Sequence, residues 1–302
     1  MHMKLSGTRS AAPREKFTVF SAILLGLLIL YVISLFIPLF WAFVTSFKDQ
    51  NTDFRINVIG FPKEWIIDNF RTIFMEFSYS VDSVAGTRQV GVGMLYLNSL
   101  AYALGCSFCA TIVPCITAYL CARFPYKFSK VICMTVIIVM VIPIVGSQPS
   151  EVQMARMLGL YDTIWGLWIM KANFLGMYFL VFFGIFKVLP KGYSEAAKVD
   201  GAGNFTVLFR IVLPLVRNTF FTVMLINFIT FWNDYQTPLI FMPSFPTISM
   251  GMWQMASTNI QNFATVPMGM AGAIIMLIPI LAIFLAFHKR LLGNLTLGGL
   301  KG

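Results

Sequence analysis

The chain has 302 residues, enough for one large domain or two small ones. Hydrophobic residues make up 58% of it and charged residues 11%, whereas a typical soluble domain holds about 45–50% and about 25%. This composition excludes an ordinary soluble domain and predicts an all-α polytopic protein that spans the lipid bilayer.

The apolar runs, taken in chain order, predict six transmembrane helices. They cover approximately residues 17–46, 93–122, 131–147, 174–188, 215–241 and 267–288. Residues 1–16 are polar and basic, and the apolar run after them is too long for a signal-peptide core. We therefore expect a cytoplasmic N-terminus over 1–16 and a transmembrane domain over 17–302, ending in a cytoplasmic tail over 289–302.

Three segments between the predicted spans are assigned to the outer side. Residues 47–92 form a loop with a short interfacial helix at 65–70. Residues 148–171 carry Trp165 and Trp168, an aromatic type enriched at membrane interfaces, and predict an interfacial or partly re-entrant helix. Residues 243–266 form a second outer loop.

The charged residues are distributed unevenly over this topology. The segments assigned to the cytoplasm, together with Arg217 at the cytoplasmic start of the fifth span, carry 15 Lys/Arg and three acids, whereas the remainder carries seven Lys/Arg and nine acids. This is the positive-inside pattern, and it predicts that both termini are cytoplasmic. The net charge of +10 is therefore explained by orientation and by anionic lipid, and it does not require a nucleic-acid partner.

Residues 187–214 form the longest polar run on the basic side. Ser194 is expected to cap a helix that has Glu195 at its positive end. Gly201 and Gly203 should end this helix, because glycine tolerates a left-handed conformation. A second amphipathic helix is expected to follow and to end at Pro214, so the segment reads as helix, glycine turn and helix.

This segment resembles the cytoplasmic loop of permease subunits of ATP-binding-cassette importers. The matching positions are Glu195, Ala196, Ala197, Gly201, Ile211, Leu213 and Pro214, and the flanking Asp200 and Ala202 are similar to the sugar-importing branch. The segment 232–235 with Pro238 and Leu239, and the C-terminal run 295–302, are similar to that branch and to the smaller maltose-importer permease. Only Leu297 departs from it, where a small residue is more usual.

The resemblance implies the fold of a type I importer permease, located in the bacterial inner membrane. It implies that Glu195, Ala196, Ala197, Asp200 and Gly201 couple the chain to an ATPase subunit. In this transporter class a Gly-x-x-x-x-Gly-Lys-Ser/Thr motif binds the phosphates of ATP, and the chain does not contain it. We therefore expect that the chain is not an enzyme and that it binds no cofactor itself. Two partner ATPase subunits would hold ATP and Mg²⁺, beside a second homologous permease and an external, periplasmic solute-binding protein.

Polar and aromatic residues in the predicted fifth span are candidates for the translocation path. Because polar groups inside a membrane are costly unless they face a cavity or a partner, Asn227, Trp232, Asn233 and Tyr235 are assigned to the path or to the substrate. Two structural alternatives stay open. Trp232 and Tyr235 could be interface anchors, and Asn233 with Asp234 could fix one helix to its neighbour.

The outer loop 243–266 is neutral and carries side chains that can hydrogen-bond without net charge. We expect Trp253, Gln254 and Asn259 to contact the binding protein, the alternative being a plain connector.

The transported solute is expected to be an oligosaccharide, and an acidic one such as alginate is an option. Arg156 and Lys171 could meet its carboxylates, or could pair with Glu151 and Asp162.

The competing functions are a self-powered secondary transporter of a small polar solute and a membrane enzyme. The five cysteines all lie in the second and third predicted spans. Cys106 and Cys109 have the spacing of a metal or redox pair, but free cysteines are usually small buried hydrophobic residues, and we interpret them so. The 18 methionines are scattered apolar fillers, so no metal site is expected.

Overall fold

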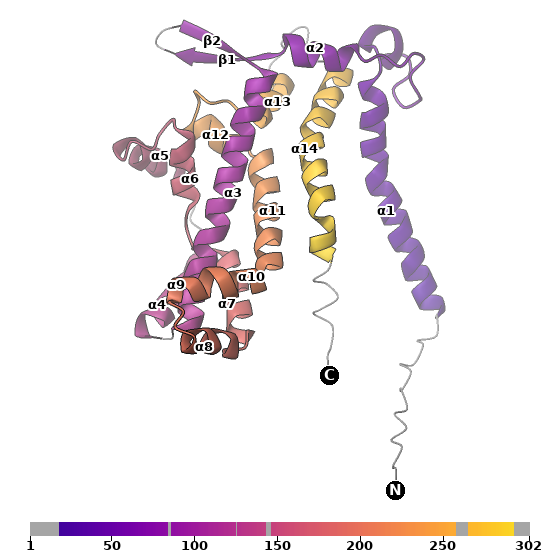
Figure 1. Ribbon diagram of the computed structural model, residues 1–302. Helices are drawn as coiled ribbons and strands as arrows, with labels where there is room; N and C mark the ends of the chain where they lie inside the picture. Colours follow the sequence, from indigo (N-terminus) through magenta and orange to yellow (C-terminus); the bar gives the residue numbers. More distant parts are fainter. Residues whose placement is uncertain (1–17, 84–85, 125, 143–145, 258–264, 293–302) are drawn as a thin grey trace.

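A computed structural model of the chain describes residues 18–83, 86–124, 126–142, 146–257 and 265–292. The described residues are mostly helical, and the long helices run side by side in Figure 1. The elements in chain order are α1 (Val19–Ser46), η1 (Gln50–Phe54), α2 (Asp68–Glu76), β1 (Ser78–Ser83), β2 (Gly86–Gly91), α3 (Val92–Arg123), α4 (Lys127–Val141), α5 (Gln148–Met157), α6 (Ile164–Lys171), α7 (Met177–Val188), α8 (Gly192–Val199), α9 (Asn204–Thr206), η2 (Val207–Val212), α10 (Leu213–Leu215), α11 (Arg217–Asn233), α12 (Gln236–Phe241), α13 (Ile248–Ser257) and α14 (Val266–Leu292).

Three of the described helices, α1, α3 and α14, are long and apolar enough to cross a membrane. A fourth span results if the helical run 204–215 and α11 are taken as one bent span. The predicted third and fourth spans correspond to α4 and α7, which have 15 and 12 residues, fewer than the roughly 20 that a span needs. The described residues thus form a polytopic helical membrane protein, but they do not confirm six spans.

Helix α3 is the centre of the bundle and packs against α11, α7 and α6. Tyr102, in the first half of this helix, has no exposed surface. On α7 the side chains of Phe179, Phe182 and Phe186 are also fully buried, at the spacing of one helical face. This periodicity explains why α7 folds against α3 although it is short.

One end of the bundle is capped by α2, by the hairpin of β1 and β2, and by α13 (Figure 1). We call it the hairpin end. The strands pair antiparallel from Ser78 opposite Gly91 to Ser83 opposite Gly86. The sequence predicted a loop here with a helix at 65–70. The helix instead begins at Asp68, and the hairpin was not expected.

A buried lysine ties the end of α1 to this cap. Lys48 has no exposed surface, and its Nζ donates to the carbonyl oxygens of Asn57 at 2.6 Å and Val58 at 3.4 Å. The side-chain amide of Asn69 donates to the carbonyl oxygens of Ser46 and Lys48, at 2.8 and 2.9 Å. These bonds hold α1 at the hairpin end.

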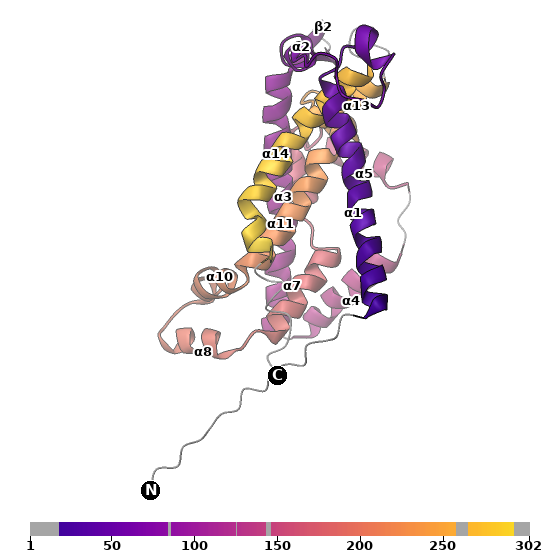
Figure 2. The same ribbon diagram turned by 90° about the vertical axis from the view of Figure 1, so that its right-hand side faces the viewer.

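Farther along, α1 has little cover from the rest of the described chain. Figure 1 shows α1 at the margin of the bundle, and Figure 2, turned by 90°, shows it in front of the other helices. The helix it packs against is α14. An open groove of about 920 Å³ separates the two, lined by apolar side chains that include Phe36, Phe40, Ile274 and Leu277. Most of α1 therefore presents apolar side chains to its surroundings.

At the opposite end, which we call the α8 end, the chain turns out of the bundle and back (Figure 2). Two details differ from the sequence prediction. Helix α8 begins at Gly192 with Lys191 as its N-cap, so Ser194 lies inside the helix and does not cap it. Pro214 does not end the second helix, because it occupies the first turn of α10, where proline's missing N–H costs nothing.

The second helix ends instead at a sharp bend. The run 204–215 and α11 meet at 77° around Val216, whose amide donates to the carbonyl oxygens of Val212 and Leu213, each at 3.2 Å. Val216 is buried. The loop of the α8 end is therefore joined to α11 through a hydrogen-bonded, packed corner.

Candidate coupling and translocation sites

The glycine turn after α8 has the geometry that the sequence predicted. Gly201 has a φ of +83°, and its amide donates to the carbonyl oxygen of Lys198 at 3.0 Å. The amide of Ala202 donates to the carbonyl oxygen of Ala197 at 2.9 Å. A Cβ atom added at Gly201 would meet nothing within 4 Å, so glycine is required here by the backbone and not by space.

The predicted coupling residues lie around this turn. Glu195 is in the first turn of α8 and is exposed, as are Ala196 and Asp200. Ala197 is half-buried and packs against the core formed by α3, α7 and η2. The alanine thus anchors the helix, while the two carboxylates point to its surroundings.

The end of α3 fixes α8 in place. The guanidinium of Arg123 donates through Nη2 to the carbonyl oxygen of Leu189 at 2.7 Å. The ammonium of Lys198 lies over the ring of Phe124, 5.5 Å from its centroid. Between these groups is a cavity of about 210 Å³, which Glu195 and Ser194 also line. The loop is therefore attached to the end of α3 in this conformation.

The outward face of the loop carries large apolar residues that the sequence analysis did not select. Val199 and Phe205 are 88% and 80% exposed, and Tyr193 is also exposed. The signal was present in the sequence, since all three flank Glu195 and Gly201 on short amphipathic segments. Exposed apolar side chains grouped beside charged ones are typical of a protein-binding surface.

Two of the predicted path residues are buried between helices. The side-chain amide of Asn227 on α11 donates to the hydroxyl of Thr111 on α3 at 3.1 Å. Trp232 is 1% exposed, and its Nε1 donates to the carbonyl oxygen of Met276 on α14 at 3.1 Å. Both residues hold α11 to its neighbours in this conformation.

Asp234, the residue after α11, joins three elements. Its carboxylate accepts hydrogen bonds from the hydroxyl of Tyr102 and the amide of Thr237, both at 3.0 Å. Its carbonyl oxygen accepts from the hydroxyl of Ser249 on α13 at 2.8 Å. The neighbouring Asn233 is exposed, and its amide donates back to the carbonyl oxygen of Ile229 at 2.8 Å.

The structure brings together two residues that the sequence analysis assigned to different sites. The rings of Tyr235 and Trp253 stack with centroids 5.6 Å apart and an interplanar angle of 11°. Each side chain is 39% exposed at the hairpin end. Gln254 is half-buried beside them, and its Oε1 has no hydrogen-bond partner among the described residues. Asn259 lies outside the described residues.

The segment 243–266 is more than the predicted loop. Its helix α13 buries Ile248, Met250 and Met255 in the core at the hairpin end. Trp253 projects from a helix that is held on its opposite side, so its position is fixed.

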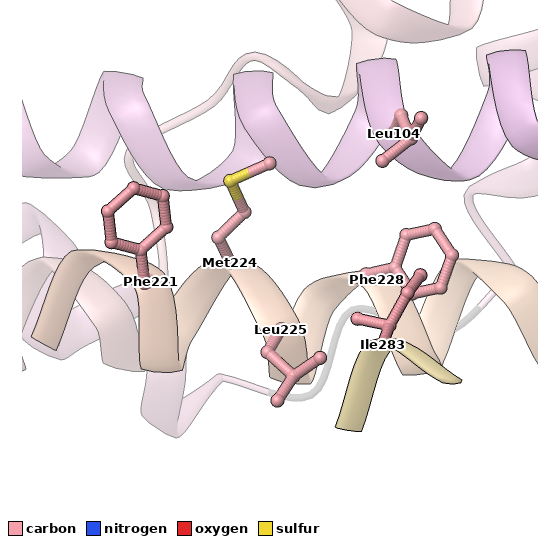
Figure 3. A pocket seen from close by; sticks show the side chains of 6 residues that line it. All are labelled: Leu104, Phe221, Met224, Leu225, Phe228 and Ile283. Atoms are coloured by element: carbon pink, nitrogen blue, oxygen red, sulfur yellow. The ribbon is translucent and has the colours of Figure 1, made fainter. Parts of the chain in front are cut away.

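A cavity in the middle of the bundle is apolar. Figure 3 shows its lining, which comes from Leu104 of α3, four side chains of α11 and Ile283 of α14. Its volume is about 180 Å³. None of these lining side chains is polar. A sugar bound there would leave its hydroxyl groups without partners, so this cavity is not suited to a sugar in the conformation described.

The two cations considered for an acidic solute have aromatic neighbours. The guanidinium of Arg156 lies 4.5 Å from the ring centroid of Tyr161, and the ammonium of Lys171 lies 6.0 Å from that of Phe231. Asp162 accepts hydrogen bonds from the amide and the hydroxyl of Ser244, at 2.9 and 2.6 Å. Lys171 also lines a cavity of about 120 Å³ with Asn173 and Tyr178.

A bundle of apolar helices around α3, with an anchored helix–glycine–helix loop projecting from one end, defines a membrane transport subunit. The chain belongs to the family of binding-protein-dependent transport system inner membrane components, whose family model matches residues 27–293. This confirms the membership that the residues of the 187–214 loop predicted.

Similar curated proteins cover nearly the whole chain. It is 24% identical over 296 residues to the diacetylchitobiose uptake system permease protein NgcG of Streptomyces coelicolor, covering 96% of this chain and 91% of the relative. It is 29% identical over 287 residues to the maltodextrin transport system permease protein MalD of Streptococcus pneumoniae, covering 92% and 93%.

The fold also matches a solved structure. The chain superposes with a TM-score of 0.72 on a chain of a bacterial ABC transporter involved in the import of the acidic polysaccharide alginate. The match covers 93% of this chain and 99% of that chain, at 18% sequence identity. At this identity the match shows the shared fold.

Proposed function

We propose that the chain is a permease subunit of an ATP-driven oligosaccharide importer in the bacterial inner membrane. It contributes half of the translocation path and transmits the work of ATPase subunits that dock on the α8 end. The observation that carries the proposal is the loop around Gly201, which is anchored to α3, bonded to α11 and exposes both carboxylates and apolar side chains. Family membership and the sugar-uptake relatives support it.

The remaining partners follow from the same proposal. A second permease fills the apolar groove between α1 and α14, where this chain leaves its own helix uncovered. An external binding protein docks at the hairpin end, near Trp253, Gln254 and Asn259. Two ATPase subunits hold ATP and Mg²⁺, and the chain itself performs no hydrolysis. Both termini, the residue 1–16 segment and the 289–302 tail, lie in the cytoplasm.

The mechanism is alternating access. ATP binding draws the ATPase subunits together and moves the α8 loops, which shifts the permease pair towards an outward-open state. The binding protein then releases the sugar into the path, where Asn227, Trp232, Asn233 and Tyr235 become exposed, and hydrolysis restores the inward state. Such a cycle requires only that ATP and sugar have different affinities for the two states.

A self-powered secondary transporter is the alternative. Such proteins need a free ionisable residue near the membrane midplane. Asp234 is the acid within the predicted spans, and its carboxylate is already occupied by Tyr102 and Thr237. The geometry therefore favours an external energy source.

The test is ATP hydrolysis by the whole importer in liposomes, with binding protein and a panel of neutral and acidic oligosaccharides. We expect at least one oligosaccharide to stimulate hydrolysis and to accumulate inside, and Glu195→Ala to lower the stimulation. Solute uptake without any ATPase subunit would contradict the proposal. Equal stimulation by neutral and acidic sugars would remove an acidic preference and leave the importer function intact.

A further inference from the structure

A cavity of about 810 Å³ opens at the α8 end of the bundle. It lies between α4 and α7 and is also lined by Cys121 of α3. Its lining divides into two parts. The rim carries three lysines, Lys127 and Lys130 of α4 and Lys187 of α7, all of them exposed. The other part of the lining is mostly apolar and includes Met134, Ile137 and Phe183, which lie farther from the α8 end along α4 and α7.

The lysines converge because of helix geometry. Lys127 and Lys130 are three residues apart and so share a face of α4, and Lys187 is in the last turn of α7. The free amides of the first turn of α4 add their positive dipole at the same place. None of the ten residues that line the cavity is acidic, so the rim presents uncompensated positive charge.

Two exposed aromatic residues next to this rim bear on its position relative to the membrane. Tyr126 and Phe128 are exposed and stack with centroids 6.4 Å apart and an interplanar angle of 12°. Tyrosine is one of the two aromatic types enriched at the level of lipid headgroups. We therefore infer that the lysine rim beside Tyr126 lies at headgroup level and that the apolar part faces the hydrocarbon region.

We propose that this cavity is a binding site for an anionic phospholipid. The phosphate and the anionic headgroup are held by Lys127, Lys130 and Lys187, and an acyl chain lies along Met134, Ile137 and Phe183. Charge complementarity selects the occupant, because a purely apolar partner helix would bury three lysines without counter-charges. Basic cavities between membrane helices bind anionic lipid headgroups on the same principle. The site does not depend on which solute is transported.

The test uses photolabelling in native membranes that contain the full-length chain with its partner subunits. Two probes are compared, phosphatidylglycerol and phosphatidylethanolamine, which carry the same acyl-chain diazirine. Chymotryptic peptides are then mapped by mass spectrometry, because the lysine variants remove tryptic sites. We expect peptides within residues 126–137 to be labelled on the order of tenfold more by the anionic probe.

The triple variant Lys127→Gln, Lys130→Gln and Lys187→Gln should reduce the anionic probe's labelling to the level of the zwitterionic probe. The charge-conserving triple Lys→Arg variant at these positions should keep it, which separates loss of charge from misfolding. A matched control removes three exposed cations at the hairpin end, Lys63→Gln, Arg71→Gln and Arg88→Gln, and should change nothing.

Three outcomes would overturn the proposal. They are equal labelling by both probes in the unaltered chain, unchanged labelling in the triple glutamine variant, and labelling that millimolar inorganic phosphate abolishes, which would assign the rim to a soluble anion. A fourth outcome, no labelling of these peptides by either probe in the assembled importer, would mean that a partner subunit covers the cavity, and it would overturn the proposal as well.

Discussion

The hydroxyl of Tyr102, in the first half of α3, donates a 3.0 Å hydrogen bond to the carboxylate of Asp234, which directly follows α11. The two residues are 132 positions apart in the chain. Their bond sits at the contact of α3 with α11, where Asp234 also bonds α13 through Ser249. The junction explains why α11 ends at this point and why the outer elements stay attached to the bundle.

Replacing Tyr102 by Phe should therefore destabilise the protein. A hydrogen bond to a charged group contributes roughly 1.5–3 kcal/mol, and its loss leaves a carboxylate oxygen without a donor. We expect a lower Tm in detergent, measured by static light scattering or dye binding. Tyr31→Phe is the control, because this tyrosine of α1 is exposed and the same hydroxyl group is removed. Equal Tm values for Tyr102→Phe and the unaltered protein would show that the junction does not contribute.

Replacing Gly201 by Val should uncouple ATP hydrolysis from sugar. The φ of +83° is strained for a β-branched residue, at a cost of about 1–3 kcal/mol, which is comparable with typical coupling free energies. The spans should still insert and bind the partner permease, whereas sugar-stimulated hydrolysis in liposomes should fall about 5–150-fold.

Gly203 provides the matched control for this experiment. Its φ is −69°, which valine adopts readily, and an added Cβ would meet nothing within 4 Å. Gly203→Val should therefore retain coupling. If Gly201→Val retains full sugar-stimulated hydrolysis and transport, residues 195–201 are not the transmission element.

The exposed apolar residues of the loop should be needed for assembly with the ATPase. Val199→Ser with Phe205→Ser removes most of the apolar surface there and leaves Glu195 and Asp200 in place. We expect less ATPase to copurify with the tagged chain, at an unchanged level of chain in the membrane. Ile59→Ser, at a residue 85% exposed at the hairpin end, is the control. Undiminished copurification would mean that the carboxylates alone make the contact.

The hairpin end should contact the binding protein through α13. In a background without the five native cysteines, a cysteine at Gln254 should form a disulfide or a bifunctional crosslink with the binding protein when ATP is bound. Asn259→Cys extends the scan beyond the described residues. A cysteine at Val199, at the opposite end of the bundle, should give none. A scan of 243–266 without any crosslink would make this segment a plain connector.

Local pattern was sufficient for the coupling loop. The positive φ of Gly201 and the place of Glu195 in the first turn of α8 follow from residues within ten positions of each other, and both are confirmed. The boundaries of α1, α3 and α14 followed from long apolar runs and agree within a few residues. The predicted start of α8 and the predicted role of Pro214 as a helix end were wrong. Helix boundaries depend on the backbone conformation of each residue, which the residue type alone does not determine.

The site at the hairpin end could not be predicted in this way. The stacking of Tyr235 on Trp253 and the burial of Trp232 against Met276 depend on how α11, α13 and α14 pack. The hairpin did leave a signal in the sequence, since Tyr79 and Val81 alternate with polar residues and the glycine Gly86 follows them at the turn. In the structure this glycine has a positive φ. The surrounding polar residues and the short strands concealed it within a segment that reads as a loop.

The corner at Val216 makes the loop of the α8 end and α11 two parts of one connected path through the bundle. The run 204–215 bends by 77° into α11 at a joint that is both hydrogen-bonded and buried. The far end of α11 is held by the bond of Trp232 to α14 and, directly after the helix, by the bond of Asp234 to α3. A displacement of the loop that passes through this corner would therefore act on these two bonds at the hairpin end, so a change of state has to break the contacts that hold α11 in this conformation.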